Sequence, residues 1–461
     1  MEEFSRSAGS ITLQTLRAII EPKIPLNDSP NFSSDLTHLR NYTDLILRSI
    51  NDTIGLKTKL PRTEKVDELE SLVKQYEVVI ISDEPMTGKS VLLKLLANRL
   101  RKDGEIIAFS VERFTGCTLG AFLQSLQIQN DLTAILESIG SAPFRCILID
   151  GLERAKDQEK KLILDDLILA IGSYNKSVLA AKGHKNNCWR IVCTCRSSEC
   201  QNILIHSGFR EYLANETLKI MEVGGLSNEE IAEVQKQFPN LVDLVSKDNL
   251  KQFISRPLIL DILTLPNVTL SPNLIPSKLT ESWLFDWYWK EIVRLGEGNR
   301  YGLGHPDQRE NIMLNLATKS LKGEAVQLDS INVDPQVVSG LIMDRLLIKD
   351  GNTLRFAHDV IEDWALTILL KCNERELIQF LLQYKEPLSL ARPFSIYASY
   401  LLEHDQSSEK WLSLLTLLED KKKSITTLAT NCINRPSFLA QASGNITKDS
   451  IPSFSERRVS L

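Results

Sequence analysis

The feature that most constrains this chain is a short apolar run followed at once by a glycine-containing loop and an amphipathic segment. Residues 78–81 are Val-Val-Ile-Ile, an uninterrupted run typical of a central parallel strand covered on both faces. Gly88, Lys89 and Ser90 follow, and leucines then recur at helical spacing as Leu92, Leu93, Leu95, Leu96 and Leu100. The sequence therefore predicts a buried strand, a tight loop and a helix in immediate succession.

A loop of this kind binds phosphate, because backbone N–H groups and the helix N-terminus present fixed positive potential to phosphate oxygens. We expect Lys89 to reach the β- and γ-phosphates and the Ser90 hydroxyl to bind Mg²⁺. The pattern G-x-x-x-x-G-K-[ST] is incomplete, since Asp83 stands at its first glycine. The alternative is a solvated lysine at a helix start. Candidate nucleotide contacts are Glu84, Pro85, Met86, Thr87, Gly88, Lys89, Ser90 and Val91.

Two later apolar strands end in residues suited to phosphate chemistry. Asp150 ends the strand 145–150, and Glu153 follows three residues later. An acid in the first position can hold Mg²⁺ through water, and an acid in the second can polarise the attacking water, so Asp150 and Glu153 receive these roles. Thr194 and Arg196 end the strand 189–195, where Arg196 could sense a γ-phosphate. The alternative readings are solvated turn residues and an exposed loop arginine.

The ordered co-occurrence of several segments resembles the NACHT branch of the STAND signal-transduction NTPases over about residues 60–372. These segments are Asp150-Gly-Leu-Glu153, Thr194-Cys-Arg196, Val223-Gly-Gly-Leu-Ser-Asn-Glu-Glu-Ile231, Ser255-Arg-Pro-Leu-Ile-Leu260 and Leu354-Arg-Phe-Ala-His-Asp-Val-Ile-Glu-Asp-Trp364. The resemblance implies that Pro257 lies against the adenine and that His358 faces the nucleotide in the resting state. It also implies that the Thr194–Arg196 strand lies between the Asp150 strand and the phosphate-loop strand.

The implied fold is an α/β P-loop NTPase with a parallel sheet of ASCE-like order, then an all-α small domain, a winged helix and a C-terminal helical repeat-like segment. The implied activity is a switch and slow ATPase with ATP or ADP and Mg²⁺ as cofactors. ADP holds a closed monomer, and ATP with an unknown protein trigger opens it into a homo-oligomer. Family members act in defence or signalling. Two alternatives remain open, a scaffold that binds nucleotide without hydrolysing it and an AAA-like DNA-processing ATPase.

The expected domains follow these landmarks. They are a helical N-terminal segment (1–60), a P-loop NTPase domain (61–225), a small helical domain (226–278), a winged-helix domain (279–372), a helical repeat-like segment (373–440) and a flexible tail (441–461). The expected strands lie near 77–83, 105–111, 145–150, 189–195 and 218–223, and expected helices include 10–20, 34–54, 64–75, 153–171 and an aromatic helix at 280–295. Residues 1–60 are either a helical adaptor or the outer face of the NTPase module.

Composition limits the partners and the compartment. A net charge of −5 and a pI near 5.9 do not favour a nucleic-acid surface. No apolar stretch approaches the roughly 20 residues needed to span a bilayer, so we expect a cytoplasmic protein without membrane contact. Eight cysteines suit that compartment. Cys193 and Cys195 lie two apart on one strand without a C-x-x-C pair, which favours buried thiols over a zinc site.

Overall fold

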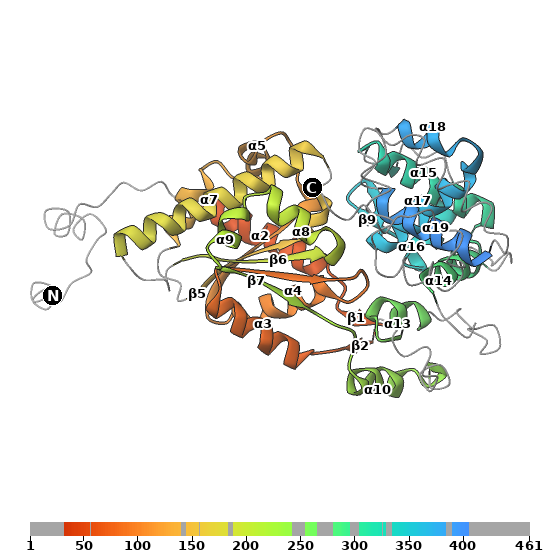
Figure 1. Cartoon of the computed structure of the whole chain (residues 1–461), viewed down its shortest axis with the longest axis horizontal. Coiled ribbons are helices and arrows are strands. Elements are labelled where there is room, and N and C mark those ends of the chain that lie inside the picture. The colour runs from red at the N-terminus through yellow and green to blue at the C-terminus, as the bar shows by residue number, and fades with distance from the viewer. Residues whose placement is uncertain are drawn as a thin grey trace, which may run out of the picture.

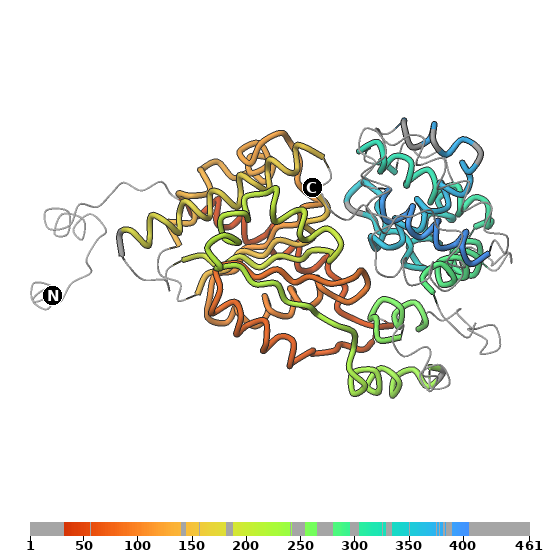
Figure 2. Tube along the Cα trace, in the orientation of Figure 1, coloured from red at the N-terminus to blue at the C-terminus, as the bar shows by residue number. Residues whose placement is uncertain are grey.

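The structure is a computed structural model that describes residues 32–55, 57–139, 144–155, 157–182, 188–241, 254–264, 280–295, 304–324, 326–328, 334–383 and 390–404. Within these residues the chain forms two lobes, shown side by side in Figures 1 and 2. One lobe is a sheet with helices on both faces, and the other is mainly helical. The helix expected at 10–20 and the segments expected beyond residue 404 lie outside the described residues.

Five parallel strands form the sheet of the first lobe, in the order β4-β5-β6-β3-β7. They are β3 (Val78–Asp83), β4 (Gly104–Ser110), β5 (Phe144–Asp150), β6 (Arg190–Arg196) and β7 (Leu218–Glu222). The expected strands are confirmed to within a residue, and so is the position of β6 between β5 and β3. Because all five strands are parallel, their carboxyl ends share one edge, where Asp83, Asp150 and Arg196 lie.

Helices cover both faces of this sheet (Figure 1). They are α3 (Thr63–Gln75), α4 (Lys89–Leu100), α5 (Leu119–Ser125), α6 (Leu132–Ser138), α7 (Gln158–Lys182), α8 (Ser197–His206) and α9 (Arg210–Ala214), with 3₁₀ turns η2 (Val111–Arg113) and η3 (Leu152–Arg154). The helix expected at 153–171 instead begins at Gln158. Residues 152–154 form η3, and Asp157 then accepts the N–H of Lys160 at 2.7 Å, which starts the helix.

The edge strand β4 is covered by α2 (Ser33–Ser49). Thr43 Oγ1 accepts a hydrogen bond from the N–H of Ala108 in β4 at 3.0 Å, and Arg40 pairs with Glu105 at 2.8 Å. Buried α2 residues such as Leu39 join the same apolar core as the sheet. Residues 33–49 therefore pack as an outer layer of the sheet lobe and leave this sheet edge covered.

The helix expected over 34–54 ends five residues early. Asn51 Oδ1 accepts the N–H of Thr53 at 3.1 Å and starts a turn, because such a side chain offers the backbone an alternative to the helix. The short strand β1 (Thr53–Ile54) then pairs with β2 (Thr58–Lys59). This hairpin leads into α3.

Beyond β7 a small group of helices comprises α10 (Asn228–Gln237), the 3₁₀ turn η5 (Pro239–Leu241) and α13 (Pro257–Leu263). A capping box opens α10: Ser227 Oγ accepts the N–H of Glu230, and the Glu230 carboxylate accepts the N–H of Ser227. The N–H of Gly55 donates to Asp261 Oδ1 at 2.7 Å, which joins α13 to the turn between β1 and β2.

The second lobe holds the remaining elements. They are α14 (Glu281–Tyr288), a π-helical turn η7 (Trp289–Val293), α15 (Pro306–Leu321), β8 (Val326–Gln327), α16 (Pro335–Met343), β9 (Leu347–Asp350), β10 (Thr353–Phe356), α17 (Asp359–Cys372), the 3₁₀ turn η10 (Glu374–Glu376), α18 (Leu377–Leu382) and α19 (Ala391–His404). The strands form a small antiparallel sheet in the order β8-β10-β9. Among the described residues of this stretch, α15 and α16 precede the hairpin of β9 and β10, and α17 follows it.

The aromatic segment at 280–295 packs inside this lobe. Phe285 and Tyr288 are buried, and the Tyr288 ring lies 4.9 Å from the ring of Trp364 on α17. Trp283 and Trp287 stack at 6.1 Å and stay partly exposed. Apolar burial of this kind fixes α14 against α17, which carries the residues that meet the sheet lobe.

Two expectations concern metal and membrane. Cys188, Cys193, Cys195 and Cys200 are all buried. In the described part of the chain, no group of three or more His, Cys, Asp and Glu side chains could hold a metal ion. No helix within that part is both long and apolar enough to cross a membrane.

Candidate functional site

The loop between β3 and α4 has a backbone shape that depends on two left-handed residues. Met86 has φ 74° and Gly88 has φ 88°, and Gly88 is the N-cap of α4 without a side-chain cap. The first N–H groups of α4 therefore point toward the carboxyl edge of the sheet with no capping side chain. The strained Met86 is held because its side chain is buried in the apolar core of the second lobe and α13.

Asp83 fills a structural role where the phosphate-loop pattern has glycine. Its Oδ1 accepts the N–H of Glu84 at 2.6 Å, and its Oδ2 accepts the N–H of Gly224, just beyond β7, at 2.7 Å. Asp83 is absent from the residues with positive φ, so its backbone does not require glycine. The departure from the pattern thus leaves the loop geometry intact and ties it to the neighbouring strand.

Lys89 lies at the first turn of α4 and lines the cavity at the carboxyl edge. Its Nζ donates to the carbonyl oxygens of Asp83 at 2.8 Å and Glu84 at 2.7 Å. Burial lowers the pKa of Lys89, and the charge of Glu153 acts against that shift. A cation held over the loop in this way is placed to meet an anion that enters the cavity.

Ser90, Asp150 and Thr194 form one hydrogen-bonded group from three elements. Ser90 Oγ donates to Asp150 Oδ1 at 2.8 Å, and Thr194 Oγ1 donates to the same oxygen at 2.7 Å. Thr194 Oγ1 also accepts the N–H of Gly151 at 2.7 Å, which fixes the turn after β5. Burial raises the pKa of the Asp150 carboxyl despite these hydrogen bonds. A hydroxyl beside a buried carboxylate is an oxygen donor set suited to Mg²⁺.

Glu153 lies on η3 with its side chain 9% exposed. Its Oε1 is 3.6 Å from Nε of Arg196, and its Oε2 is buried without a hydrogen-bond partner among the described residues. Such an orphaned acceptor facing a cavity can take a water or a ligand hydroxyl. Glu153 therefore lines the cavity with one unpaired carboxylate oxygen, and its expected role in polarising water stays a prediction.

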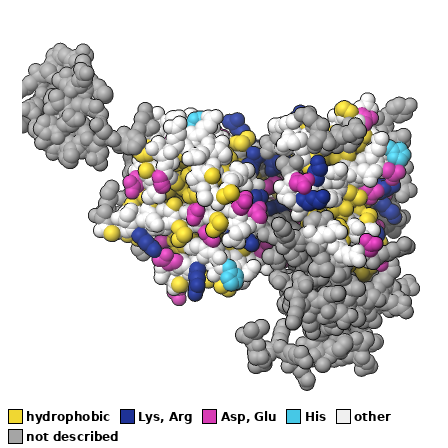
Figure 3. Space-filling view, turned by 90° about the horizontal axis from the view of Figure 1, so that it is seen from above, with side chains coloured by type: hydrophobic (Ala, Val, Ile, Leu, Met, Phe, Trp, Pro, Cys, Tyr) yellow, Lys and Arg dark blue, Asp and Glu magenta, His cyan; other side chains and the backbone are white. Residues whose placement is uncertain are grey.

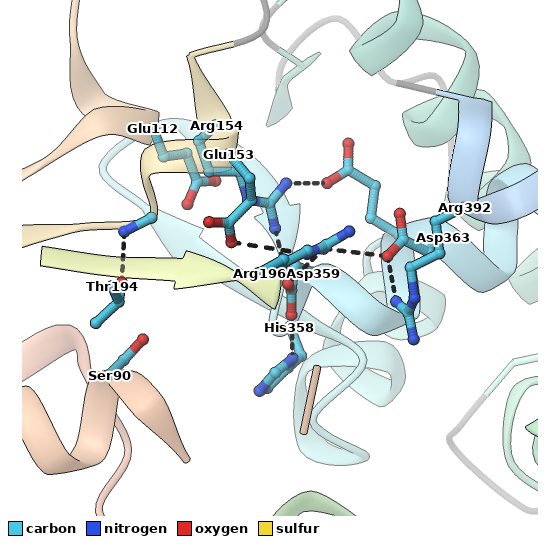
Figure 4. A network of polar contacts seen from close by, with 12 residues as sticks. Ser90, Glu112, Glu153, Arg154, Thr194, Arg196, His358, Asp359, Asp363 and Arg392 are labelled. Carbon is cyan, nitrogen blue, oxygen red and sulfur yellow. Dashed lines mark hydrogen bonds and ion pairs between the residues drawn. The ribbon is translucent and has the colours of Figure 1, made fainter. Parts of the chain in front are cut away.

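Arg196 ends β6 and is held by acids from the other lobe. Its NH2 lies 2.5 Å from Asp359 Oδ2 and 3.1 Å from Asp363 Oδ2, both on α17 (Figure 4). Burial alone would lower the pKa of Arg196, but Asp363 and Asp359 raise it. Arg196 is not among the residues that line the cavity. In this arrangement it joins the lobes, and its expected contact with a γ-phosphate remains a proposal.

His358 precedes α17 and lines the cavity. Its Nδ1 lies 2.6 Å from Asp359 Oδ1, which orients the ring, and its side chain is 39% exposed. Burial alone would raise the pKa of Asp359, but Arg196, His358 and Arg154 outweigh burial and hold that pKa well below its usual value. Asp359 is therefore an anion that lies beside two arginines of the sheet lobe.

The cavity has a volume of about 760 Å³ and both charged and apolar walls. Pro257 opens α13 beside the loop, since a Cβ added at Gly88 would lie 3.5 Å from its Cγ. Of the expected loop contacts, Glu84 and Thr87 are not among the lining residues. The apolar lining from α2, β1, the loop after β7 and α13 comprises Ile46, Ile50, Ile54, Leu226, Pro257 and Leu258. A ligand with a flat apolar part and an anionic tail fits such a cavity.

Arg62 is a site residue that sequence reasoning did not find. It has φ 45°, and its guanidinium donates to the carbonyls of Thr87 at 3.2 Å and Gly225 at 3.1 Å and lies 3.3 Å from Glu230. It therefore ties the phosphate loop to the segment after β7. The sole signal in the sequence was a lone arginine after Pro61 at the start of α3.

Comparisons with known proteins complete the description of the site. No protein-family model and no curated protein matches the chain. Distant similarity to solved structures is found, with TM-scores of 0.32 for both a Walker-type ATPase of Pyrococcus abyssi and AMPPCP-bound DnaA from Aquifex aeolicus, and 0.34 for ORC2 of Aeropyrum pernix in ADPNP and ADP complexes. The Pyrococcus protein is 12% identical, and the match covers 66% of this chain and 95% of that one. For DnaA the values are 15%, 78% and 91%, and for ORC2 they are 13%, 69% and 97%.

Proposed function

We propose that the chain is an ATP- and ADP-dependent molecular switch of the STAND NTPase type. ADP favours the arrangement described above, and ATP with an unidentified protein trigger favours an open form that assembles into a homo-oligomer. The output belongs to defence or signalling. The observation that carries the proposal is the contact between α17 and the carboxyl edge of the large sheet. Asp359 and Asp363 of α17 form ion pairs there with Arg196.

In this proposal, the residues at the carboxyl edge of the sheet bind different parts of the nucleotide. Loop N–H groups and Lys89 hold the phosphates, the base lies against Pro257 and its apolar neighbours, and His358 faces the β-phosphate. Ser90 and Asp150 hold Mg²⁺, which supplies charge neutralisation on the phosphates when bound. Glu153 orients a water, and Thr194 keeps Asp150 in place. Opening then requires α17 to leave the edge, which any ligand can favour only by its differential affinity for the two forms.

The decisive experiment measures mass and nucleotide content together. Any nucleotide that co-purifies with the chain is first removed and identified. The mass of the protein in solution is then measured with Mg·ADP and with Mg·AMPPNP. We expect a monomer with Mg·ADP and a larger fraction of oligomers with Mg·AMPPNP. A protein that binds neither nucleotide contradicts the proposal.

Turnover is tested separately, because a scaffold that binds without hydrolysis is the first rival. Glu153→Gln is expected to retain Mg·ATP and to slow phosphate release by roughly 10²-fold or more, since it removes the group that polarises water. The orphaned Glu153 Oε2 favours hydrolysis over mere binding. A wild-type protein that binds ATP without releasing phosphate would establish the scaffold instead.

A DNA-processing ATPase is the second rival, and the helix-then-hairpin succession of α16, β9 and β10 is the feature that favours it. Residues 335–343 of α16 contain neither lysine nor arginine. On the face shown in Figure 3, acidic side chains of the described residues lie among the basic ones. Salt-sensitive duplex binding with DNA-stimulated hydrolysis would support this rival.

A further inference from the structure

Two arginines from the sheet lobe converge on a single carboxylate oxygen. Asp359 Oδ2 lies 2.5 Å from NH2 of Arg196 and 3.7 Å from NH2 of Arg154 (Figure 4). Only one of this pair lines the cavity, and it is Arg154. A place where two guanidinium groups share one oxygen is an anion site, and a carboxylate from α17 fills it here.

The turn that carries Arg154 holds it beside the catalytic acids. Arg154 follows Glu153 directly on η3, and its side chain is 15% exposed. Gly151 has φ 78°, and a Cβ added there would lie 3.1 Å from Cγ of Arg154. The close approach of Gly151 and Arg154 leaves no room for a side chain at position 151, and the short turn keeps the Arg154 backbone next to Glu153.

The ion-pair partners of Arg154 come from α17. Its NH1 donates to Glu362 Oε2 at 2.8 Å, and Glu362 in turn accepts a short hydrogen bond from Ser320 Oγ. Glu112, on η2, is the acid of the sheet lobe that also acts on Arg154, and it lies 3.6 Å from Arg355 of β10. When α17 leaves the edge, Arg154 loses two carboxylates while it still faces the cavity. The Arg154 guanidinium is then available to the oxygens of an anionic ligand in the cavity.

We propose, on the basis of the nucleotide switch above, that Arg154 binds the terminal phosphate of ATP in the open form and that Glu362 and Asp359 mask it in the closed form. The Arg154 side chain thus stabilises both the closed form and the open form. It pairs with carboxylates when α17 is docked and with phosphate oxygens when α17 is withdrawn. Arg154 is then a residue that distinguishes ATP from ADP, because ADP lacks the group it would contact.

Substitutions of Arg154 and of Glu362 are expected to change the affinity for AMPPNP in opposite directions. Arg154→Gln and Glu362→Gln both remove the Arg154–Glu362 pair, so a pure latch would change AMPPNP binding in the same direction in both variants. If Arg154 binds phosphate, Glu362→Gln frees it and tightens Mg·AMPPNP binding, whereas Arg154→Gln removes the contact. We expect the Kd of Arg154→Gln for AMPPNP to exceed that of Glu362→Gln by at least about tenfold. Their Kd values for ADP are both expected to exceed that of wild type, because each variant weakens the closed form.

Calorimetric titration of the full-length variants with both nucleotides supplies these values, and circular dichroism establishes that each is folded. Arg294→Gln removes an arginine paired with Asp307 and Glu310 inside the second lobe and serves as the matched control. Should Arg154→Gln not fold, Arg154→Lys retains the charge without the planar fork and is expected to bind AMPPNP more weakly than Glu362→Gln. Equal AMPPNP affinities of the Arg154 and Glu362 variants would overturn the proposal. A wild-type protein that binds neither nucleotide would instead contradict the switch itself.

Discussion

At the scale of single residues, Lys89 is the group on which nucleotide binding depends most directly. Its Nζ now satisfies two loop carbonyls and would exchange them for phosphate oxygens. We predict that Lys89→Ala costs on the order of 2–4 kcal/mol of affinity for ATP and ADP, the loss of a buried charge-assisted contact. Calorimetry measures this, with Lys74→Ala on the exposed face of α3 as control. Unchanged binding would leave Lys89 as a solvated lysine at a helix start.

The Asp150 carboxylate is expected to lower the free energy of unfolding at neutral pH while it supports Mg²⁺ binding. Because burial raises its pKa, the folded chain binds this proton more readily than the unfolded chain does. The ionised carboxyl then lowers the free energy of unfolding increasingly as pH rises from the ordinary value of about 4 through the folded pKa. Asp150→Asn keeps an oxygen that accepts from Ser90 and Thr194 and removes the charge. We predict a higher Tm for Asp150→Asn at pH 7, with the gain vanishing near pH 4.

The same variant is expected to weaken Mg²⁺-dependent nucleotide binding by roughly tenfold or more, since a carboxylate ligand is lost. Scanning calorimetry across pH without nucleotide, followed by titration with and without Mg²⁺, separates the two effects. A lower Tm at pH 7 would show that hydrogen bonding, rather than buried charge, dominates at this position.

At the scale of elements, Asp83 connects the phosphate loop to the end of β7 and should matter for stability more than for affinity. Asp83→Ala removes acceptors from the N–H groups of Glu84 and Gly224, which is expected to cost about 1–3 kcal/mol. Asp83→Gly completes the sequence pattern, yet we predict the same destabilisation and no gain in nucleotide affinity, because the backbone there does not use positive φ.

Chemical denaturation and nucleotide titration of Asp83→Ala, Asp83→Gly and Asp83→Asn test this prediction. The asparagine retains one acceptor oxygen and is expected to be intermediate in stability. Tighter ATP binding by Asp83→Gly than by wild type would mean that the aspartate distorts the loop after all.

Elements with strong apolar runs were predictable from sequence, and their ends were less so. All five strands of the large sheet lie where runs such as 78–81 place them. The end of α2 and the start of α7 differ from expectation because single side chains, Asn51 and Asp157, redirect the backbone locally.

The candidate site was predictable only in part, for a reason of distance along the chain. Lys89 and Ser90 come after β3, and Asp150 and Thr194 lie in the last residues of β5 and β6. One parallel sheet brings the carboxyl ends of these strands together. The contacts of Arg196 with Asp359 and of Arg154 with Glu362 join residues 163 and 208 positions apart. No periodicity or spacing encodes such pairs, because they depend on how the second lobe meets the first.

At the scale of the whole molecule, Asp363 links the contact between the lobes to the interior of the second lobe. Its Oδ2 lies 3.1 Å from NH2 of Arg196 and also accepts a short hydrogen bond from Arg392 on α19, which in turn pairs with Glu281 on α14. Asp363 is therefore shared by two arginines, of which only Arg196 belongs to the sheet lobe. A change at Asp363 acts on both closure and stability, whereas a change at Glu281 touches the second lobe alone.

We predict that Asp363→Asn shifts the chain toward the open form. If the lost charge weakens the docked arrangement by about 1–3 kcal/mol, the open fraction rises roughly 5- to 150-fold. The mass distribution with Mg·AMPPNP, measured without any trigger, should then contain more assemblies than wild type, and ADP should dissociate faster. Glu281→Gln is the matched control, because it lowers the stability of the second lobe without removing a partner of Arg196. If both variants lose stability but share the wild-type mass distribution and ADP release rate, the Arg196–Asp363 pair supports the second lobe and does not restrain the switch.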